Sequence, residues 1–328
     1  MKSKSLFWLL ITVLLTTASF AEAQQRTNVF RIGYLSSPSL SVTPARIEVF
    51  RRGLRELGYV EGKNIVIEYR SAEGKLDRLP ALAAELVRLK VDIIVTSGPT
   101  AARAAKEATV TIPIVMTQVG DPVGSGFVAS LARPGGNITG MATLAPELNG
   151  KRLELLKEII PKLSRVAVFG TSINPGTAQS LKEVELAAGA FGVRLQYLDV
   201  LGPKDIETAF RAASKGRAEA VLMMVGGGIA SALQTQILDL AVKSRLPVMY
   251  TRARFVEAGG LMTYGVNVND LDRRAATYVD KILKGRTPAD LPVEQPMKFE
   301  FIINLKGAKQ IGLTIPPNVL VRADKAIR

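Results

Sequence analysis

The feature of this sequence that most restricts its fold is a regular alternation of short apolar runs with amphipathic segments. The run VDIIV at residues 91–95 is almost free of polar side chains, and the next segment, residues 100–108, is typical of a helix. Strands that are apolar on both sides belong to parallel sheets covered by helices on each face, because consecutive parallel strands are joined by helical crossovers. The alternation therefore predicts an α/β fold.

This alternation runs through the chain twice. In the first series we expect strands at residues 29–35, 64–69, 91–95 and 114–116, and helices at 79–90, at 100–108 and around Ile47, Phe50 and Leu54. In the second series we expect helices at 148–160, 177–191, 205–215 and 229–244, and strands at 165–169, 193–200, 220–225 and 247–250. The Gly- and Pro-rich stretch ARPGGNITG, residues 132–140, separates them. Two doubly wound parallel-sheet lobes are predicted, and one long doubly wound sheet is the alternative.

The composition limits the chemistry. The 328 residues include no Cys and no His, which excludes thiolate and imidazole catalysis, disulfides and Cys/His zinc sites. Asp270 and Asp272 are typical of a first helical turn, and two acids without a third oxygen donor make a poor cation site. We therefore expect no cofactor, no bound metal and no catalytic residue.

The net charge of +14 raises the possibility of a nucleic-acid partner. The basic residues are, however, spread over many amphipathic segments, as in Lys151, Arg152 and Lys157, and no aromatic-rich basic strand is present. We interpret these residues as solvated helix faces, and we expect no nucleic-acid partner.

The first residues have the pattern of a signal peptide. Lys2 and Lys4 precede an apolar stretch, residues 6–15, and AEA at residues 21–23 fits a small-x-small cleavage site. The apolar stretch is only about half of the roughly 20 residues that span a bilayer, which argues against the alternative of an uncleaved anchor. We expect residues 1–23 to be removed and the mature protein to reside in the periplasm.

Polar residues follow two of the apolar runs directly. Ser97 and Thr100 come after residues 91–95, and Gln118 and Asp121 come after Pro113 to Met116. Ligands of open parallel sheets collect beyond the carboxyl ends of the strands, where helix N-termini also point. Ser97 and Thr100 could cap the helix, either alone or while also receiving an anionic group of a ligand. Asp121 could meet an ammonium group or hydroxyl, or cap the turn before Pro122.

Long stretches of the chain resemble one known family. The stretches are FRRGLRELGYVEGKNIVIEYR (50–70), GDPVGSGFVASLARPGGNITG (120–140), GKRLELLKEIIP (150–161), FVEAGGLMTYG (255–265) and DLPVEQPMKFEFIINLKGAKQIGLTIPP (290–317). They are similar to the ABC-transporter substrate-binding proteins, a family that includes receptors for tryptophan and other aromatic amino acids. The resemblance implies a type I periplasmic-binding fold, in which two lobes joined by a three-segment hinge enclose a ligand.

The resemblance also implies where the lobes and the ligand lie. We expect a first lobe over residues 24–140, completed by about 262–290, and a second lobe over 141–261, while the lobe of residues 291–328 is left open. The expected ligand-binding residues are Ser36, Ser37, Ser97, Thr100, Gln118, Asp121, Asn174, Gly227, Tyr250 and Arg252. The sequence VGGGIAS at 225–231 departs from the family pattern, so its glycines either bring backbone close to the ligand or enlarge the pocket. It also lacks the further residues of a phosphate-binding loop.

The expected function is that of a monomeric receptor that passes a small molecule, an amino acid or a related carboxylate, to an ABC permease and its ATPase. A ligand sensor for a membrane kinase is the alternative among binding proteins. An exported α/β enzyme is the other alternative, although the Ser residues of the cleft have no partner base for nucleophilic catalysis.

The signal peptide leads to a first prediction. Expressed in a Gram-negative host, the mature protein should begin at Gln24 and be released by osmotic shock, because residues 1–23 direct export and are then removed. N-terminal sequencing of the released fraction tests this. Recovery of an intact Met1 in the cytoplasm would contradict it.

Overall fold

The computed structural model describes residues 29–42 and 44–328, so the expected signal peptide lies outside the described residues. The first lobe is built on a parallel five-stranded sheet with the order β2-β1-β3-β4-β5. Its strands are β1 (Phe30–Ser36), β2 (Ile65–Ser71), β3 (Ile93–Ser97), β4 (Ile114–Val119) and β5 (Ile138–Ala142). Its helices are α2 (Pro44–Glu56), α3 (Leu79–Arg88), α4 (Pro99–Ala108) and α11 (Val268–Leu283), with short 3-10 turns at Leu40–Val42, Leu76–Arg78 and Pro288–Asp290.

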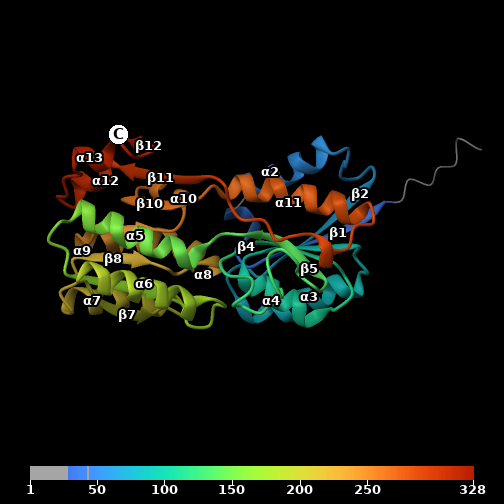
Figure 1. The fold of residues 1–328 in the computed structure, drawn as a ribbon, viewed down its shortest axis with the longest axis horizontal. Coiled ribbons are helices and arrows are strands. Elements are labelled where there is room, and N and C mark those ends of the chain that lie inside the picture. Colours follow the sequence, from blue (N-terminus) through green and yellow to red (C-terminus); the bar gives the residue numbers. More distant parts are fainter. Residues whose placement is uncertain (1–28, 43) are drawn as a thin grey trace, which may run out of the picture.

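The second lobe is built on a seven-stranded sheet with the order β12-β11-β10-β9-β8-β6-β7, in which β11 runs antiparallel to β10. Its strands are β6 (Arg165–Gly170), β7 (Arg194–Asp199), β8 (Ala220–Met223), β9 (Val248–Tyr250), β10 (Met262–Val266), β11 (Phe299–Asn304) and β12 (Lys325–Ile327). Its helices are α5 (Ala145–Ile159), α6 (Thr177–Phe191), α7 (Pro203–Lys215), α8 (Gly227–Ala232), α9 (Gln234–Ser244), α10 (Ala253–Glu257), α12 (Leu305–Gln310) and α13 (Pro317–Leu320). Figure 1 shows the two lobes side by side along the longest axis.

The central strands of each sheet are buried on both faces, as the apolar runs predicted. In β3, Ile93 and Val95 point into one apolar cluster, and Ile94 between them points into the cluster on the opposite face. In β6, Val168 and Phe169 divide in the same way, and Phe169 meets Phe210 of α7 edge to face with ring centroids 5.0 Å apart. Because successive side chains of a strand point to opposite faces, a strand covered on both sides must be apolar throughout.

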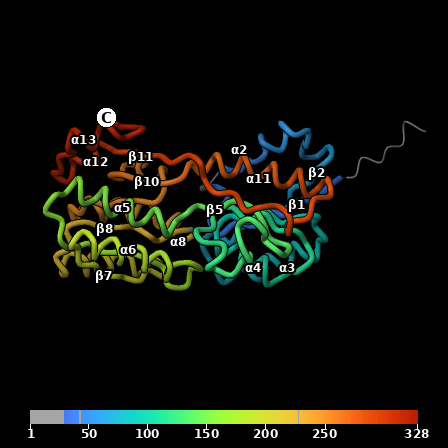
Figure 2. The backbone as a smooth tube through the Cα atoms, viewed as in Figure 1, coloured from blue at the N-terminus to red at the C-terminus, as the bar shows by residue number. Residues whose placement is uncertain are grey.

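Three chain segments connect the lobes, and Figure 2 shows them between the two halves of the molecule. The first, residues 143–144, joins β5 to α5, and the second, Asn267, joins β10 to α11. The third leads to β11 after Glu294, which pairs with Met141 of β5. Asn267 donates its backbone N–H to the Lys298 carbonyl at 3.3 Å, so the second and third crossings lie against each other.

The expected strands of both series are present, with ends that shift by a few residues, and the alternative of one long sheet is wrong because the strands form two sheets. The helix expected at 229–244 is two helices, α8 and α9, which meet at Leu233. The structure places β10 in the second sheet, so the chain returns to the first lobe only at α11. It also places residues 299–328, which the sequence left open, with the second lobe.

Helix α11 is held on the first lobe by a buried ion pair. Arg46 of α2 donates from Nε to Asp272 Oδ2 at 2.7 Å and from Nη2 to Oδ1 at 3.2 Å, and Asp272 is only 2% exposed. Burial disfavours the charge on Arg46, but the adjacent Asp272 carboxylate outweighs burial and raises the pKa of the guanidinium. The pair therefore fixes the helix that begins after the second crossing.

Removal of one partner of this pair should destabilise the protein. Asp272→Ala leaves a buried guanidinium without its carboxylate, so we expect the free energy of unfolding to fall by about 3–5 kcal/mol, measured by urea denaturation. The control is Glu154→Ala, which breaks the exposed Lys151–Glu154 pair of α5 and should cost less than about 1 kcal/mol. Equal losses in the two variants would contradict the assignment.

Candidate functional site

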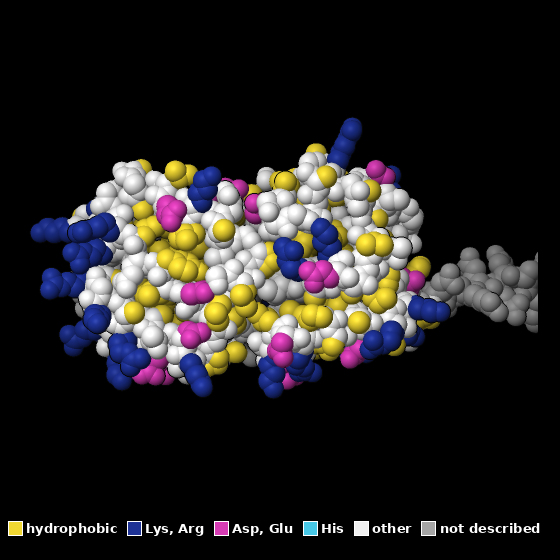
Figure 3. Space-filling view, turned by 90° about the horizontal axis from the view of Figure 1, so that it is seen from below, with side chains coloured by type: hydrophobic (Ala, Val, Ile, Leu, Met, Phe, Trp, Pro, Cys, Tyr) yellow, Lys and Arg dark blue, Asp and Glu magenta, His cyan; other side chains and the backbone are white. Residues whose placement is uncertain are grey.

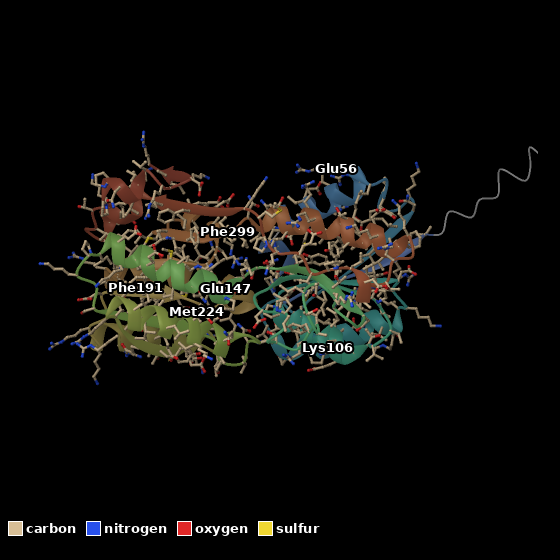
Figure 4. The ribbon with its side chains drawn as sticks, in the orientation of Figure 1. Glu56, Lys106, Glu147, Phe191, Met224 and Phe299 are labelled. Carbon is tan, nitrogen blue, oxygen red and sulfur yellow. The ribbon has the colours of Figure 1, made fainter. Side chains whose placement is uncertain are left out.

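A cavity of about 860 Å³, part of it open to solvent, lies between the lobes. The first lobe lines it with Pro99 and Thr100 at the start of α4 and with Gln118 and Gly120 at the end of β4. The crossings and the second lobe contribute Thr143, Ala145, Leu148, Asn149, Arg152, Asn174, Pro175, Gly176, Thr177, Ser180, Met224, Gly226, Thr251, Arg252 and Val266. In Figure 4, Met224 at the end of β8 and Glu147 at the start of α5 mark the side of the second lobe that faces the first.

The position of the cavity is a consequence of the direction of the strands. It lies beyond the carboxyl ends of β4, β8 and β9, and it is reached by the N-termini of α4, α5 and α6. The partial positive charge of a helix N-terminus attracts anionic groups. The Gly98-Pro99 step makes this arrangement possible at β3, because Gly98 turns the chain at φ 93° and Pro99 begins α4.

Four of the expected binding residues line the cavity: Thr100, Gln118, Asn174 and Arg252. Gln118 is 7% exposed and has a left-handed backbone with φ 61°, at the point where the register between β4 and β5 shifts. For a residue other than glycine this conformation costs about 1–2 kcal/mol, and such strain is common where a side chain is aimed at a ligand. Gly227 begins α8, next to Gly226 in the cavity wall.

The three serines at the strand ends of the first lobe are not part of the wall, and each makes a hydrogen bond to another group of the protein. The Ser37 and Thr100 hydroxyls are 2.8 Å apart, the Ser97 hydroxyl accepts a hydrogen bond from Arg46 at 3.2 Å, and Ser36 donates to the Pro38 carbonyl at 2.9 Å. The N-cap of α4 is Gly98, and no side chain caps this helix. The expectation that Ser97 or Thr100 caps α4 is therefore wrong.

Asp121 and Tyr250 are outside the cavity wall. Asp121 Oδ1 accepts the Gly124 N–H at 2.8 Å, which is the turn-capping alternative for this residue. Tyr250 is 1% exposed and stacks on Phe255 with ring centroids 5.0 Å apart, and burial raises the pKa of its hydroxyl. The structure thus places Tyr250 in the core of the second lobe.

Arg152 is the charged residue of the cavity wall that is absent from the expected binding residues. It was assigned to a solvated helix face, but it is 3% exposed and therefore buried. Its Nε donates to the Tyr264 carbonyl at 2.7 Å and its Nη1 donates to Asn149 Oδ1 at 2.6 Å. The sequence does contain a signal for the burial of Arg152. Asn149 and Arg152 share a face of α5 with Leu153 and Leu156, as their helical spacing shows.

The positive charges at the cavity are close enough to affect one another. Burial, followed by the charge of Arg252, lowers the pKa of Arg152 to about 9. Burial, followed by the charges of Arg46 and Arg254, lowers the pKa of Arg252 to about 10. Both guanidinium groups remain protonated at neutral pH.

The lobes touch on two sides of the cavity. A Cβ added at Gly228 of α8 would lie 3.0 Å from Gly74 Cα and 3.0 Å from the Ser37 carbonyl oxygen, both in the first lobe. A Cβ added at Gly176 would lie 3.4 Å from Ser125 Oγ, also in the first lobe. Gly228 therefore permits a close approach between backbones of opposite lobes.

These features define a class of protein, the two-lobed binding protein that encloses a small molecule between α/β lobes. Residues 32–327 match the family model for "ABC transporter substrate binding protein", and the chain belongs to this family. A tyrosine-binding protein of Clostridioides difficile is 26% identical over 264 residues, which are 80% of this chain and 75% of that protein.

Solved structures show the same fold. A conserved domain protein of Vibrio cholerae is 29% identical, with a TM-score of 0.85 over 91% of this chain and 99% of the other. An ABC domain in complex with L-Trp from Streptococcus pneumonia is 26% identical, with a TM-score of 0.84 over 91% and 100%. The prediction of a type I periplasmic-binding fold with two α/β lobes is confirmed, and three crossings join these lobes.

The contact at Gly228 generates a prediction about lobe closure. Gly228→Ala should weaken ligand binding by about tenfold, because the added methyl group must displace Ser37 or Gly74 only when the lobes meet. Calorimetric titration measures the affinity, and the melting temperature without ligand should not fall. The control is Gly189→Ala in α6, where an added Cβ has open space. Unchanged affinity in Gly228→Ala would contradict this role.

Proposed function

We propose that this protein is the periplasmic receptor of an ABC importer, which binds an amino acid or a related carboxylate between its lobes and delivers it to a membrane permease and its ATPase. The observation that supports this most directly is the cavity between the lobes, lined from both sides at strand ends and helix N-termini. The relatives named for tyrosine and L-Trp binding support an amino acid or a molecule of similar size.

The geometry supports a mechanism of capture by closure. Thr100 and Gln118 belong to the first lobe, whereas Arg152 and Arg252 belong to the second, so a ligand that contacts both sets holds the lobes together. The short crossings around residues 143–144, Asn267 and 295–298 connect the lobes and are the proposed hinges. Closure excludes water from the cavity and strengthens the polar contacts of the ligand.

A permease would recognise the closed protein by surfaces of both lobes brought into one relative position. On the face drawn in Figure 3, Lys and Arg side chains gather at the end of the second lobe that lies farthest from the first lobe. We propose that the receptor acts as a monomer, since one chain supplies both walls of the cavity. Within the described residues, no helix is long and apolar enough to cross a membrane.

The two alternatives differ from this proposal in the fate of the bound ligand. A sensor would bind the same ligand but would not support its uptake, which transport assays in a host with and without the permease would show. An exported enzyme would convert its ligand, whereas a receptor releases it unchanged, so mass spectrometry of the recovered ligand separates these two functions.

The proposed closure leads to a prediction about size. A thermal-shift screen of amino acids, aromatic acids and nucleosides should identify a ligand, since one present at 100 times its dissociation constant adds about 2.7 kcal/mol of stability. With that ligand, small-angle X-ray scattering should give a smaller radius of gyration than without it, because the hinges bring the lobes together. An unchanged radius at confirmed saturation would count against the mechanism.

A further inference from the structure

The charged side chains that line the cavity all have the same sign. Arg152 reaches it from α5 and Arg252 from the end of β9. Among the described residues of the wall there is no Asp or Glu. The remaining polar residues are neutral hydrogen-bonding groups such as Gln118, Asn174 and Thr251. The cavity is thus a concentration of positive charge without a carboxylate of its own.

Neither arginine has an ion-pair partner in the part of the chain that the structure describes. The hydrogen bonds of Arg152 go to a neutral carbonyl and a neutral amide, those of Tyr264 and Asn149. Arg252 is half-buried, and no protein group in residues 29–42 or 44–328 accepts a hydrogen bond from its guanidinium. Burial of a charge without a partner is unfavourable, so these two positions destabilise the empty protein.

The carboxylates nearest to the cavity are already engaged or face elsewhere. Asp272 has both oxygens occupied by Arg46, and Asp121 accepts the Gly124 N–H. Glu147, at the start of α5, is exposed and is not part of the wall. Arg254 adds a further positive charge near Arg252, and its Nη2 donates to the Ser231 hydroxyl at 2.6 Å. Asp272 also attracts the charge of Arg252, but both of its oxygens already accept hydrogen bonds from Arg46, so an ammonium group in the cavity would meet a net positive charge.

The helices increase the preference for anions. Thr100 lies in the first turn of α4, Thr177 begins α6, and Ala145 begins α5, all at the cavity. These helices have 10, 15 and 15 residues, and each N-terminus adds a partial positive charge. Leu148, Met224 and Val266 supply an apolar surface for a short hydrocarbon part of the ligand.

We infer that the ligand is an organic dianion with two carboxylate groups and no ammonium group. The inference rests on the proposed receptor function and narrows its ligand class. Two carboxylates balance the charges of Arg152 and Arg252, and a guanidinium forms strong charge-assisted hydrogen bonds to a carboxylate. Within the described residues the hydrogen bonds of Arg152 use Nε and Nη1, which leaves Nη2 to donate to a ligand. A zwitterionic amino acid would balance only one of the arginines and would place its ammonium group among cations.

Matched pairs of probes test the charge of the ligand. The protein is first unfolded and refolded to remove any ligand carried over from expression. Calorimetric titrations then compare succinate with L-aspartate, glutarate with L-glutamate, and terephthalate with benzoate. L-tyrosine and L-tryptophan are titrated in addition. We expect at least one dicarboxylate to bind about tenfold or more tightly than its amino or monocarboxylate counterpart, because only the dicarboxylate neutralises both arginines.

Substitution of one arginine separates binding from folding. Arg252→Met should weaken binding of the best dicarboxylate by roughly 100-fold, because one carboxylate loses its partner. The melting temperature of the ligand-free variant should stay level or rise, since the repulsion with Arg152 is removed. The control is Arg194→Met, at an exposed position of β7 in the second lobe, which should leave binding unchanged.

Each outcome decides the inference. Tighter binding of L-tyrosine, L-tryptophan or any other zwitterion than of every dicarboxylate would overturn it and leave the receptor function intact. The absence of dicarboxylate binding, or unchanged binding in Arg252→Met, would also overturn it. Dicarboxylate binding that leads to chemical conversion of the probe would instead contradict the receptor function while the ligand class stands.

Discussion

Burial of both sheets on both faces is the constraint on which the rest of the structure depends. The middle of a strand such as β3 or β6 is apolar on both sides, as in Ile93 to Val95 and Val166 to Phe169, so it provides no place for the polar groups that hold a ligand. Those groups collect where the strands end and helices begin, beside Thr100, Gln118 and Arg252. Two sheets that present such ends to each other enclose a polar cavity between apolar cores.

Much of this arrangement could be predicted from the sequence, because apolar runs and helical spacing depend on local patterns. The strands at 91–95 and 165–169 were found in this way, and the turn at Gly98 placed Thr100 at the cavity. The local sequence pattern does not define where the chain returns to the first lobe. That point depends on the contact of α11 with α2 through Asp272 and Arg46, which are 226 residues apart in the sequence.

The wall that the second lobe contributes was harder to predict, because whether a residue there lines the cavity depends on how the two lobes are placed relative to each other. Arg152 has the charge of a surface residue, and only the packing of α5 shows that it is buried beside the cavity. Tyr250 ends β9 and Asp121 follows β4, as ligand contacts would, but Tyr250 belongs to the core and Asp121 closes a turn. The left-handed backbone of Gln118 has no signal in its residue type.

The three crossings also determine which relative motions of the lobes are possible. A single linker would let one lobe swivel in any direction, whereas residues 143–144, Asn267 and 295–298 attach it at three places. A twist would stretch some of these attachments and slacken others, and the hydrogen bond from Asn267 to Lys298 opposes their separation. Bending about one shared axis would disturb them least, so the proposed closing motion has a single direction, set by where the three crossings lie.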